Sequence, residues 1–295
     1  MNQFSFQALG TVWWIEIFDD IDEQTLTIVN DHSERFVRAF ENTYSRFKID
    51  SDISILNEER VFKNPSLEFR SLLTYGKGLF VRSHTTFNIL TGHVQEAQGY
   101  NATYSFSPKE NSETPIVCNP LVDLSINDEE ITITCGKVDL GGYGKGYLID
   151  LVTIELKKLG INYFLINGGG DMYATSDKGE PIEIFLEHPT KPQEFIMPTH
   201  LINQGFAASS PFKRQWHHEG KTYTHVISNT EVPAIATFIK AKTACDADAF
   251  ATCALLLPEA QLLEVQAFEK FECARFDPAT NDLWQSVNFS NPSTT

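Results

Sequence analysis

The sequence lacks any long apolar segment. No stretch reaches about 20 consecutive apolar residues, the length that a membrane-spanning helix needs. The first six residues contain neither the basic nor the apolar part of a secretory signal peptide. We therefore expect no membrane span, and we expect a cytoplasmic protein unless an export segment has been removed from the chain.

Basic residues are scarce relative to acidic ones. Lys and Arg number 23 and Asp and Glu number 39, which gives a formal net charge of −16 at pH 7. Such a surface repels nucleic acids and anionic membranes, so a polyanion-binding function is excluded. An anionic small molecule would need a local cluster of hydrogen-bond donors or a metal ion.

Cysteine is also sparse, and none of the five cysteines belongs to a C-x-x-C pair. They are Cys118, Cys135, Cys245, Cys253 and Cys273. An odd, scattered set predicts reduced and mostly buried thiols, as in cytosolic proteins, and it argues against a zinc site.

The chain has enough apolar sequence for a large folded protein. Its 295 residues and 42% hydrophobic content suit one large domain or two lobes. Helical spacing is found in residues 22–47, 67–82, 150–159 and 246–257, and Ser51 is expected to cap a further short helix. Strand patterns are found in residues 4–18, interrupted at Gly10, and in residues 122–139, 163–166, 182–186, 205–209, 223–228 and 234–242. The mixed order predicts an α+β fold, with a frayed tail from about residue 290.

Glycine is concentrated in one short stretch. Four glycines lie within residues 141–146, with Lys145 among them. The pattern predicts a strand, a tight loop and a helix, whose N–H groups can approach an anion. It is not a P-loop, because Gly146 rather than Ser or Thr follows Lys145, and its spacing does not fit a dinucleotide fingerprint. A tight turn without a ligand stays open at this point.

A later helix carries two hard oxygen donors. Asp248 and Thr252 are four residues apart and so share one helix face. Mg²⁺ prefers such ligands, and the small Ala249 and Ala251 are expected to leave room for a bound molecule. Alternatively, Asp246 or Asp248 caps the helix and Thr252 bonds back to a carbonyl. We expect this helix to meet the glycine loop and the turn at residues 168–171.

Taken together, the motifs resemble the ApbE family, the FAD:protein FMN transferases. The resemblance covers nearly the whole chain, with the motifs in the order of the family. They are Leu9-Gly10-Thr11, Ser45-Arg46-Phe47, Ser51-x-Ile53-x-x-Leu56-Asn57, Phe87-Asn88, Asp139-Leu140-Gly141-Gly142-x-x-Lys145-Gly146-Tyr147-x-x-Asp150, Asn167-Gly168-Gly169-Gly170-Asp171, Ala208-Ser209-Ser210, His225-Val226-Ile227 and Asp248-Ala249-Phe250-Ala251-Thr252.

The resemblance implies an ApbE-like, T-fold-related α+β fold, as a single domain over residues 1–295. Its two mixed α/β lobes would bind FAD between them. The implied reaction moves the FMN half of FAD to a Ser or Thr hydroxyl of an acceptor flavoprotein and releases AMP. FAD and the acceptor flavoprotein are the implied partners, and Mg²⁺ is the implied cofactor.

The resemblance also assigns residues. Asp248, Thr252 and the backbone carbonyl of Gly142 would bind Mg²⁺, and His225 would be the base that takes the proton of the acceptor hydroxyl. FAD would contact Leu9, Phe47, Thr86, Phe87, Asn88, Asp139, Lys145 and Ile227. The chemistry is consistent, because Mg²⁺ and Lys145 stabilise charge on the leaving phosphate and a histidine can activate a poor nucleophile. From the residue alone, a structural or surface role for His225 is the stronger interpretation, and it is the resemblance that favours the base.

The chain departs from the family pattern at the flavin and acceptor side. Asn88 replaces an aspartate, Phe47 replaces a tyrosine, Ser228-Asn229 replaces Asp-Pro, and Ser210-Pro211 stands where glycine is usual. The central loop and the metal helix match. The departures keep two alternatives open: an FAD pyrophosphatase, in which water replaces the acceptor, and an FAD-binding protein without catalysis.

Overall fold

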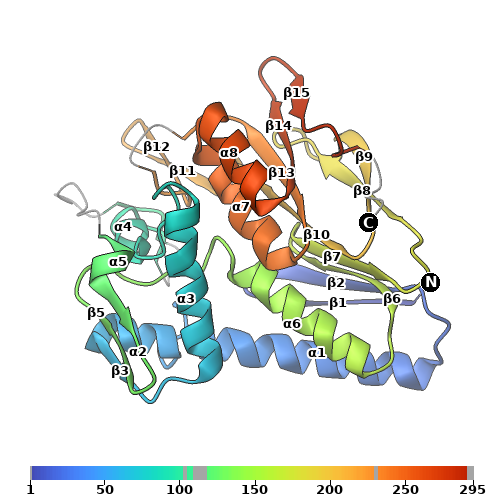
Figure 1. Ribbon diagram of the computed structural model, residues 1–295, viewed down its shortest axis with the longest axis horizontal. Helices are drawn as coiled ribbons and strands as arrows, with labels where there is room; N and C mark the ends of the chain where they lie inside the picture. Colours follow the sequence, from blue (N-terminus) through green and yellow to red (C-terminus); the bar gives the residue numbers. More distant parts are fainter. Residues whose placement is uncertain (1, 102–104, 109–117, 229–231, 291–295) are drawn as a thin grey trace. The chain divides into compact units, whose positions relative to one another are not determined.

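The computed structural model describes residues 2–101, 105–108, 118–228 and 232–290 (Figure 1). The chain divides into two compact units. Unit 1 comprises Met1–Phe40, Gly142–Ser210 and Ala234–Thr295, and unit 2 comprises Glu41–Gly141 and Pro211–Pro233. Helices and antiparallel sheets are mixed along the chain, which confirms the predicted α+β class. The expected frayed tail lies outside the described residues from residue 291 onward.

Unit 1 is built on an eight-stranded sheet with the order β1-β2-β6-β7-β10-β13-β14-β15. These strands are β1 (Asn2–Ala8), β2 (Thr11–Ile17), β6 (Tyr163–Gly168), β7 (Met172–Ser176), β10 (Gln204–Ser209), β13 (Ala236–Ala241), β14 (Glu272–Asp277) and β15 (Asp282–Gln285). Neighbouring strands pair antiparallel throughout this order.

The predicted strand over residues 4–18 is a hairpin of β1 and β2. Leu9 and Gly10 form its turn, with φ values of 50° and 69°. Glycine adopts this left-handed region without cost, whereas leucine is strained in it. Trp13 on β2 is fully buried, while its neighbour Trp14 is 51% exposed, because successive side chains point to opposite faces.

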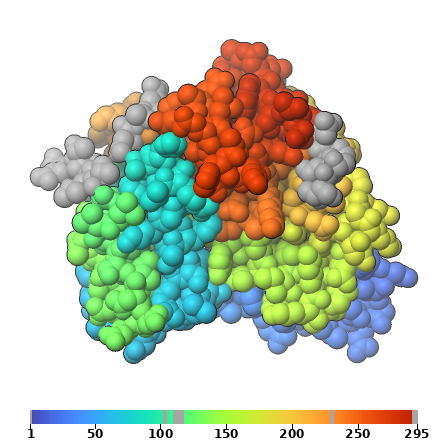
Figure 2. Space-filling view, in the orientation of Figure 1, coloured from blue at the N-terminus to red at the C-terminus, as the bar shows by residue number. Residues whose placement is uncertain are grey.

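Helices pack on one face of the sheet. They are α1 (Glu23–Tyr44), α6 (Gly144–Lys158), α7 (Ala244–Leu256) and α8 (Glu259–Glu269). Helix α6 contacts β6 and β7, and α7 contacts β10 and β13. Within unit 1, α1 meets α6 where His32 Nε2 lies 3.1 Å from Glu155 Oε2. Helix α8 lies at the surface (Figure 2), where its Phe268 is 79% exposed.

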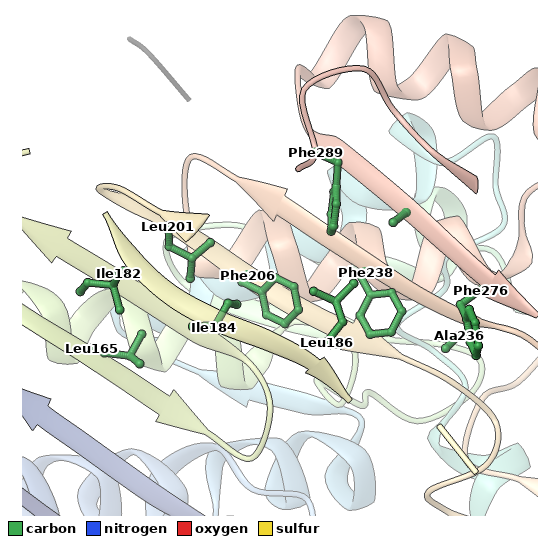
Figure 3. Packing of buried hydrophobic residues seen from close by; sticks show 12 residues of the cluster. Leu165, Ile182, Ile184, Leu186, Leu201, Phe206, Ala236, Phe238, Phe276 and Phe289 are labelled. Atoms are coloured by element: carbon green, nitrogen blue, oxygen red, sulfur yellow. The ribbon is translucent and has the colours of Figure 1, made fainter. Parts of the chain in front are cut away.

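The opposite face is covered by the hairpin of β8 (Ile182–Glu187) and β9 (Phe195–Leu201), which contacts β7 and β10. Beneath it lies a buried cluster that includes Leu186, Phe206 and Phe238 (Figure 3). Thr237, next to Phe238 on β13, points to the helical face and donates a hydrogen bond to Ala251 O at 2.8 Å. The alternation along β13 therefore separates two cores, one on each face of the sheet.

Unit 2 holds shorter elements. They are α2 (Asp52–Glu59), α3 (Leu67–Arg82), α4 (Gly92–Ala97), α5 (Pro120–Asp123), a sheet of order β3-β5-β4 with β3 (Val61–Lys63), β4 (Leu124–Ile126) and β5 (Glu130–Ile133), and a hairpin of β11 (Gln215–His218) and β12 (Lys221–Thr224). Ser51 caps α2 as predicted, since its Oγ accepts the N–H of Ser54 at 3.1 Å. The predicted hairpin in residues 122–139 is formed by β4 and β5.

One cysteine prediction is wrong. Cys118 and Cys135 form a disulfide with a Cα–Cα distance of 5.5 Å, whereas Cys245, Cys253 and Cys273 are free and buried as expected. The 17-residue spacing of the pair gave no signal, because α5 and the hairpin fold the chain back on itself. Among the described residues, every helix is too short or too polar to cross a membrane.

The approach to the glycine loop also differs from the prediction. Strand β5 ends at Ile133, and Val138 is held by a side chain instead of a strand. Asn57 Oδ1 accepts the N–H of Val138 at 2.6 Å, and Asn57 Nδ2 donates to Val138 O at 3.0 Å. The helix that was expected from residue 150 starts at Gly144, inside the glycine run. Strand β12 ends at Thr224, so residues 225–228 are not a strand.

Candidate functional site

The glycine loop opens helix α6. Tyr143 occupies the N-cap position, and the helix begins at Gly144. In its first turn, the N–H of Gly146 donates a hydrogen bond to Asp248 Oδ2 at 3.1 Å. A carboxylate of α7 thus satisfies an otherwise unpaired N–H at the start of α6, where the helix dipole also favours negative charge.

Close packing fixes α6 against the start of α7. A Cβ atom at Gly146 would lie 2.2 Å from Ala244 O, so only glycine fits there. One turn later, the Asp150 carboxylate accepts the N–H groups of Ala244 at 2.8 Å and Cys245 at 2.9 Å. Burial raises the pKa of Asp150 to about 6, helped by the charge of Asp246, although the two hydrogen bonds act to lower it. Asp150 therefore ties the two helices together beneath the loop.

Lys145 joins three segments that are distant in the sequence. Its ammonium group contacts the carboxylate of Asp171 and lies 3.6 Å from Asp248 Oδ2. Asp171 follows the second glycine turn, in which Gly168 N–H donates to Asp171 O at 2.8 Å. The side chains of Asp171 and Asp248 are only 5% and 8% exposed. The expectation that the loop, the second glycine turn and the α7 helix meet is confirmed.

The oxygen donors of this cluster fit a divalent cation. The helix cap of α7 is Thr243, whose hydroxyl donates to Asp246 Oδ2 at 2.8 Å, so the cap involves Asp246 and does not need Asp248. The Asp171 carboxylate is buried and pairs with Lys145 through Oδ2. Thr252 is half-buried one turn beyond Asp248. Two carboxylates that share one lysine, next to a hydroxyl, are hard ligands of the kind that Mg²⁺ takes.

In unit 2, the carboxylate of Asp139 is held by a buried arginine. Arg46 Nε donates to Asp139 Oδ2, and the N–H of Gly141 donates to Asp139 Oδ1 at 2.7 Å. The guanidinium carbon of Arg46 lies 4.1 Å from the centroid of the Phe47 ring. The Asp139 N–H donates to Ile89 O at 2.8 Å, so the main chain of Asp139 runs next to the residue that follows Asn88.

Local bonds hold the segment of Thr86, Phe87 and Asn88. The N–H groups of Thr86 and Phe87 donate to the backbone oxygen and Oγ of Ser83, at 3.0 and 2.9 Å. Asn88 Nδ2 donates to Cys118 O at 2.8 Å, and Asn88 Oδ1 accepts the N–H of Leu90 at 2.9 Å. The side chain of an aspartate has no N–H to donate to a carbonyl. Asparagine at position 88 can therefore bond to the carbonyl of Cys118, which the disulfide holds in place.

His225 follows β12 in unit 2. Its backbone N–H donates to Arg214 O at 3.3 Å, and its Nδ1 lies 3.4 Å from the same oxygen. A proton on Nδ1 directed at this carbonyl would make Nε2 the basic nitrogen. The backbone carbonyl of His225 accepts a hydrogen bond from Gln95 Nε2 at 3.0 Å. Ile227 is half-buried two residues on, and the departure at Asn229 lies outside the described residues.

The predicted site residues thus fall into two sets. Unit 1 carries Leu9, Gly142, Lys145, Asp248 and Thr252, and unit 2 carries Phe47, Thr86, Phe87, Asn88, Asp139, His225 and Ile227. In unit 1, Lys145 and Asp248 come together, while Leu9 lies in the β1–β2 turn. Three further residues of these clusters were not predicted as site residues from the sequence: Arg46, Gln95 and Asp171. Asp171 had a signal, its place after a glycine turn, but Gln95 had none.

Known proteins resemble this chain in sequence and in fold. The family model described as the ApbE family matches residues 9–291. A Haemophilus influenzae protein named FAD:protein FMN transferase is 24% identical over 290 residues, covering 88% of this chain and 82% of that protein. The ApbE protein of Thermotoga maritima has a similar structure, with a TM-score of 0.84 at 17% identity, covering 98% of this chain and 99% of that one. The flavin transferase ApbE of Vibrio cholerae gives a TM-score of 0.78, at 17% identity over 97% of each chain. Because the family model spans nearly the whole sequence, this chain belongs to the ApbE family.

Proposed function

We propose that this protein is an Mg²⁺-dependent FAD:protein FMN transferase. It would move the FMN half of FAD to a Ser or Thr hydroxyl of an acceptor flavoprotein and release AMP. The observation that carries the proposal is the meeting of Lys145, Asp171 and Asp248 at the start of α6, in the motif that identifies the family. The residues assigned to FAD come from both units, so both units would serve one functional domain.

In this proposal, Asp248, Thr252 and the carbonyl of Gly142 hold Mg²⁺. When bound, the ion supplies positive charge that stabilises the phosphate oxygens of the anhydride. The chain's own cation, Lys145, is aligned by Asp171 and can pair with the same phosphates. The first N–H groups of α6 point toward the loop and favour an anion there as well. These local charges offset the overall charge of −16, which would otherwise repel a dianionic ligand.

The acceptor hydroxyl needs a base, because Ser and Thr are weak nucleophiles at neutral pH. We assign this role to His225, with Nε2 as the proton acceptor. As the hydroxyl oxygen bonds to the phosphorus of FMN, the anhydride P–O bond breaks and AMP leaves with the electron pair. The hydroxyl proton passes to His225. Among the groups assigned to FAD, Asp139 still has acceptor capacity after its bonds to Arg46 and Gly141, since a carboxylate offers about four lone-pair sites.

An assay with FAD, Mg²⁺ and an acceptor flavoprotein tests the proposal. Flavin fluorescence of the acceptor on a denaturing gel, together with released AMP, is the expected result. AMP without a labelled acceptor would replace the transferase with an FAD pyrophosphatase. FAD binding without AMP would leave a non-catalytic FAD-binding protein.

The disulfide bears on the location of the protein. Cytosolic thiols are kept reduced, so the Cys118–Cys135 bond favours an oxidising compartment over the cytoplasmic location expected from the sequence. Thiol titration of the denatured, unreduced protein, isolated with its thiols blocked, should then count the 3 free cysteines. A count of 5 free thiols, equal to all the cysteines of the sequence, would instead favour a reducing compartment.

A further inference from the structure

A buried arginine organises the part of unit 2 that contains His225. The side chain of Arg46 is 4% exposed. Besides Asp139, its guanidinium donates to Gln95 Oε1 at 2.9 Å and to Tyr100 O at 3.1 Å, and it lies 4.0 Å from Glu96 Oε1. A buried cation is costly unless it is fully bonded, so these acceptors hold the guanidinium in one place.

Two aromatic rings also lie close to the same guanidinium. Its carbon lies 4.1 Å from the Phe47 ring centroid and 5.4 Å from that of Tyr100. Both rings are within the range of a cation–π contact. Arginine provides a planar fork that can stack and bond at once, which lysine does not.

The orientation of the Gln95 amide follows from the charge of Arg46. Because Arg46 only donates hydrogen bonds, Gln95 must turn its oxygen toward the guanidinium. Its Nε2 then faces the other way, where it donates to His225 O at 3.0 Å. Gln95 is buried, with 8% exposure, so water does not substitute easily for either bond.

The bonds close into a ring. From His225, the backbone N–H donates to Arg214 O at 3.3 Å, and Arg214 NH1 donates to the Tyr100 hydroxyl at 3.0 Å. The backbone carbonyl of Tyr100 accepts the hydrogen bond from Arg46, which completes the ring. The backbone of His225 is therefore held on both sides, at its N–H by Arg214 and at its carbonyl by Gln95.

We propose that Arg46 and Gln95 are positioning residues, which hold the base His225 and the FAD-contacting carboxylate Asp139 in one fixed arrangement. This inference rests on the proposed function for the roles of His225 and Asp139. Neither Arg46 nor Gln95 is assigned a contact with FAD or the acceptor. Loss of the Gln95–His225 bond should therefore slow transfer while FAD binding persists, because a base displaced by about 1 Å can cost about 100-fold in rate.

The test uses Gln95→Met and Gln95→Glu in the full-length protein. The methionine removes both hydrogen bonds at similar volume, whereas the glutamate keeps an acceptor for Arg46 and removes only the donor to His225. Gln98→Met is the matched control, since it is the same substitution three residues away. The control position contributes its main-chain oxygen, which accepts Trp216 Nε1 at 2.9 Å. The readouts are kcat and KM for FAD in acceptor labelling, and the ¹⁵N shifts of the His225 imidazole.

Both Gln95 variants are expected to lower kcat by about 10- to 100-fold, with KM for FAD within about twofold of the parent. They are also expected to shift the His225 imidazole signals, which Gln98→Met leaves in place. Unchanged imidazole signals in a folded Gln95 variant would overturn the inference, as would a kcat within twofold of the parent. A KM for FAD that rises by a factor similar to the fall in kcat would also overturn it, because that pattern indicates general disruption of the site. If the parent labels no acceptor, the proposed function fails, and the imidazole signals still decide the inference.

Discussion

The charged clusters of the two units differ in how completely they are satisfied. In unit 1, one cation, Lys145, faces the two buried carboxylates of Asp171 and Asp248, so negative charge exceeds positive charge among these three side chains. In unit 2, the buried Arg46 donates hydrogen bonds to Gln95 and Tyr100 and lies within cation–π distance of the Phe47 ring. A cluster with surplus negative charge is suited to bind a cation. A satisfied cluster is suited to hold other groups in position.

The largest expected effect is at the unsatisfied cluster. Asp248→Ala should lower Mg²⁺-dependent AMP release by about 1000-fold, since a lost metal ligand removes several kcal/mol of charge stabilisation. The measurement is the rate of AMP release from FAD across an Mg²⁺ titration. Asp246→Ala is the control on the same helix, because Asp246 bonds to the cap Thr243 and should affect stability alone. An Asp248→Ala variant with parental activity at saturating Mg²⁺ would remove the metal assignment.

The second effect tests the packing that builds the same cluster. Gly146→Ala should destabilise the protein by about 3 kcal/mol, because its Cβ would lie 2.2 Å from Ala244 O. Gly78→Ala in α3 is the matched control, since a Cβ there meets nothing within 4 Å. In that helix interior the change should instead stabilise by about 0.5–1 kcal/mol. Urea unfolding measures both, and equal shifts in the two variants would contradict the close approach of α6 to α7.

The third prediction concerns pH. Burial raises the pKa of Asp150 to about 6 from its ordinary value of 3.8, so the folded state binds this proton more tightly than the unfolded state. Its contribution to stability is therefore present below pH 4 and is lost as pH rises toward 6. The loss should be about 2 kcal/mol after allowance for solvent screening. The difference in unfolding free energy between the parent and Asp150→Asn, measured from pH 4 to pH 7, should follow this slope. A difference in unfolding free energy that stays constant from pH 4 to pH 7 would show that Asp150 does not titrate in this range.

The smallest effect is expected at the satisfied cluster. Arg46→Lys keeps the positive charge but loses the planar set of guanidinium N–H donors. It should lower the free energy of unfolding by about 1.5 kcal/mol, because the hydrogen bonds to Gln95 and Tyr100 become weaker. Arg38→Lys is the control, because Arg38 forms an exposed pair with Glu34 that is worth about 0.3–0.5 kcal/mol. Thermal unfolding compares the two. Equal shifts of the unfolding temperature in the two variants would mean that the buried Arg46 contributes no more to stability than the exposed Arg38.

The contrast between the units also explains what the sequence predicts well. Lys145, Asp171 and Asp248 lie in short motifs whose glycines and helical spacing indicate their local structure, so their meeting is predictable. Ala249 and Ala251, however, are 0% and 1% exposed, because α7 packs closely on β10 and β13. They serve that packing instead of leaving room for a ligand. Small residues alone do not reveal which of these two purposes they serve.

Gln95 shows where sequence-based inference stops. Its two partners, Arg46 and His225, are 49 and 130 residues away, and no local pattern marks contacts of that range. The Cys118–Cys135 pair escaped prediction for the same reason. Helix α8 and strands β7, β9, β14 and β15 were not expected either, because packing against the large sheet stabilises them more than their own periodicity indicates.

The most direct test of the account is a crystal of the protein soaked with FAD and Mn²⁺ as a substitute for Mg²⁺, read by the anomalous signal of the metal. We predict a metal peak bonded to Asp248 and to the pyrophosphate oxygens of FAD, with Lys145 beside the same phosphates. A pyrophosphate bound elsewhere, or a metal that does not touch Asp248, would contradict the central claim.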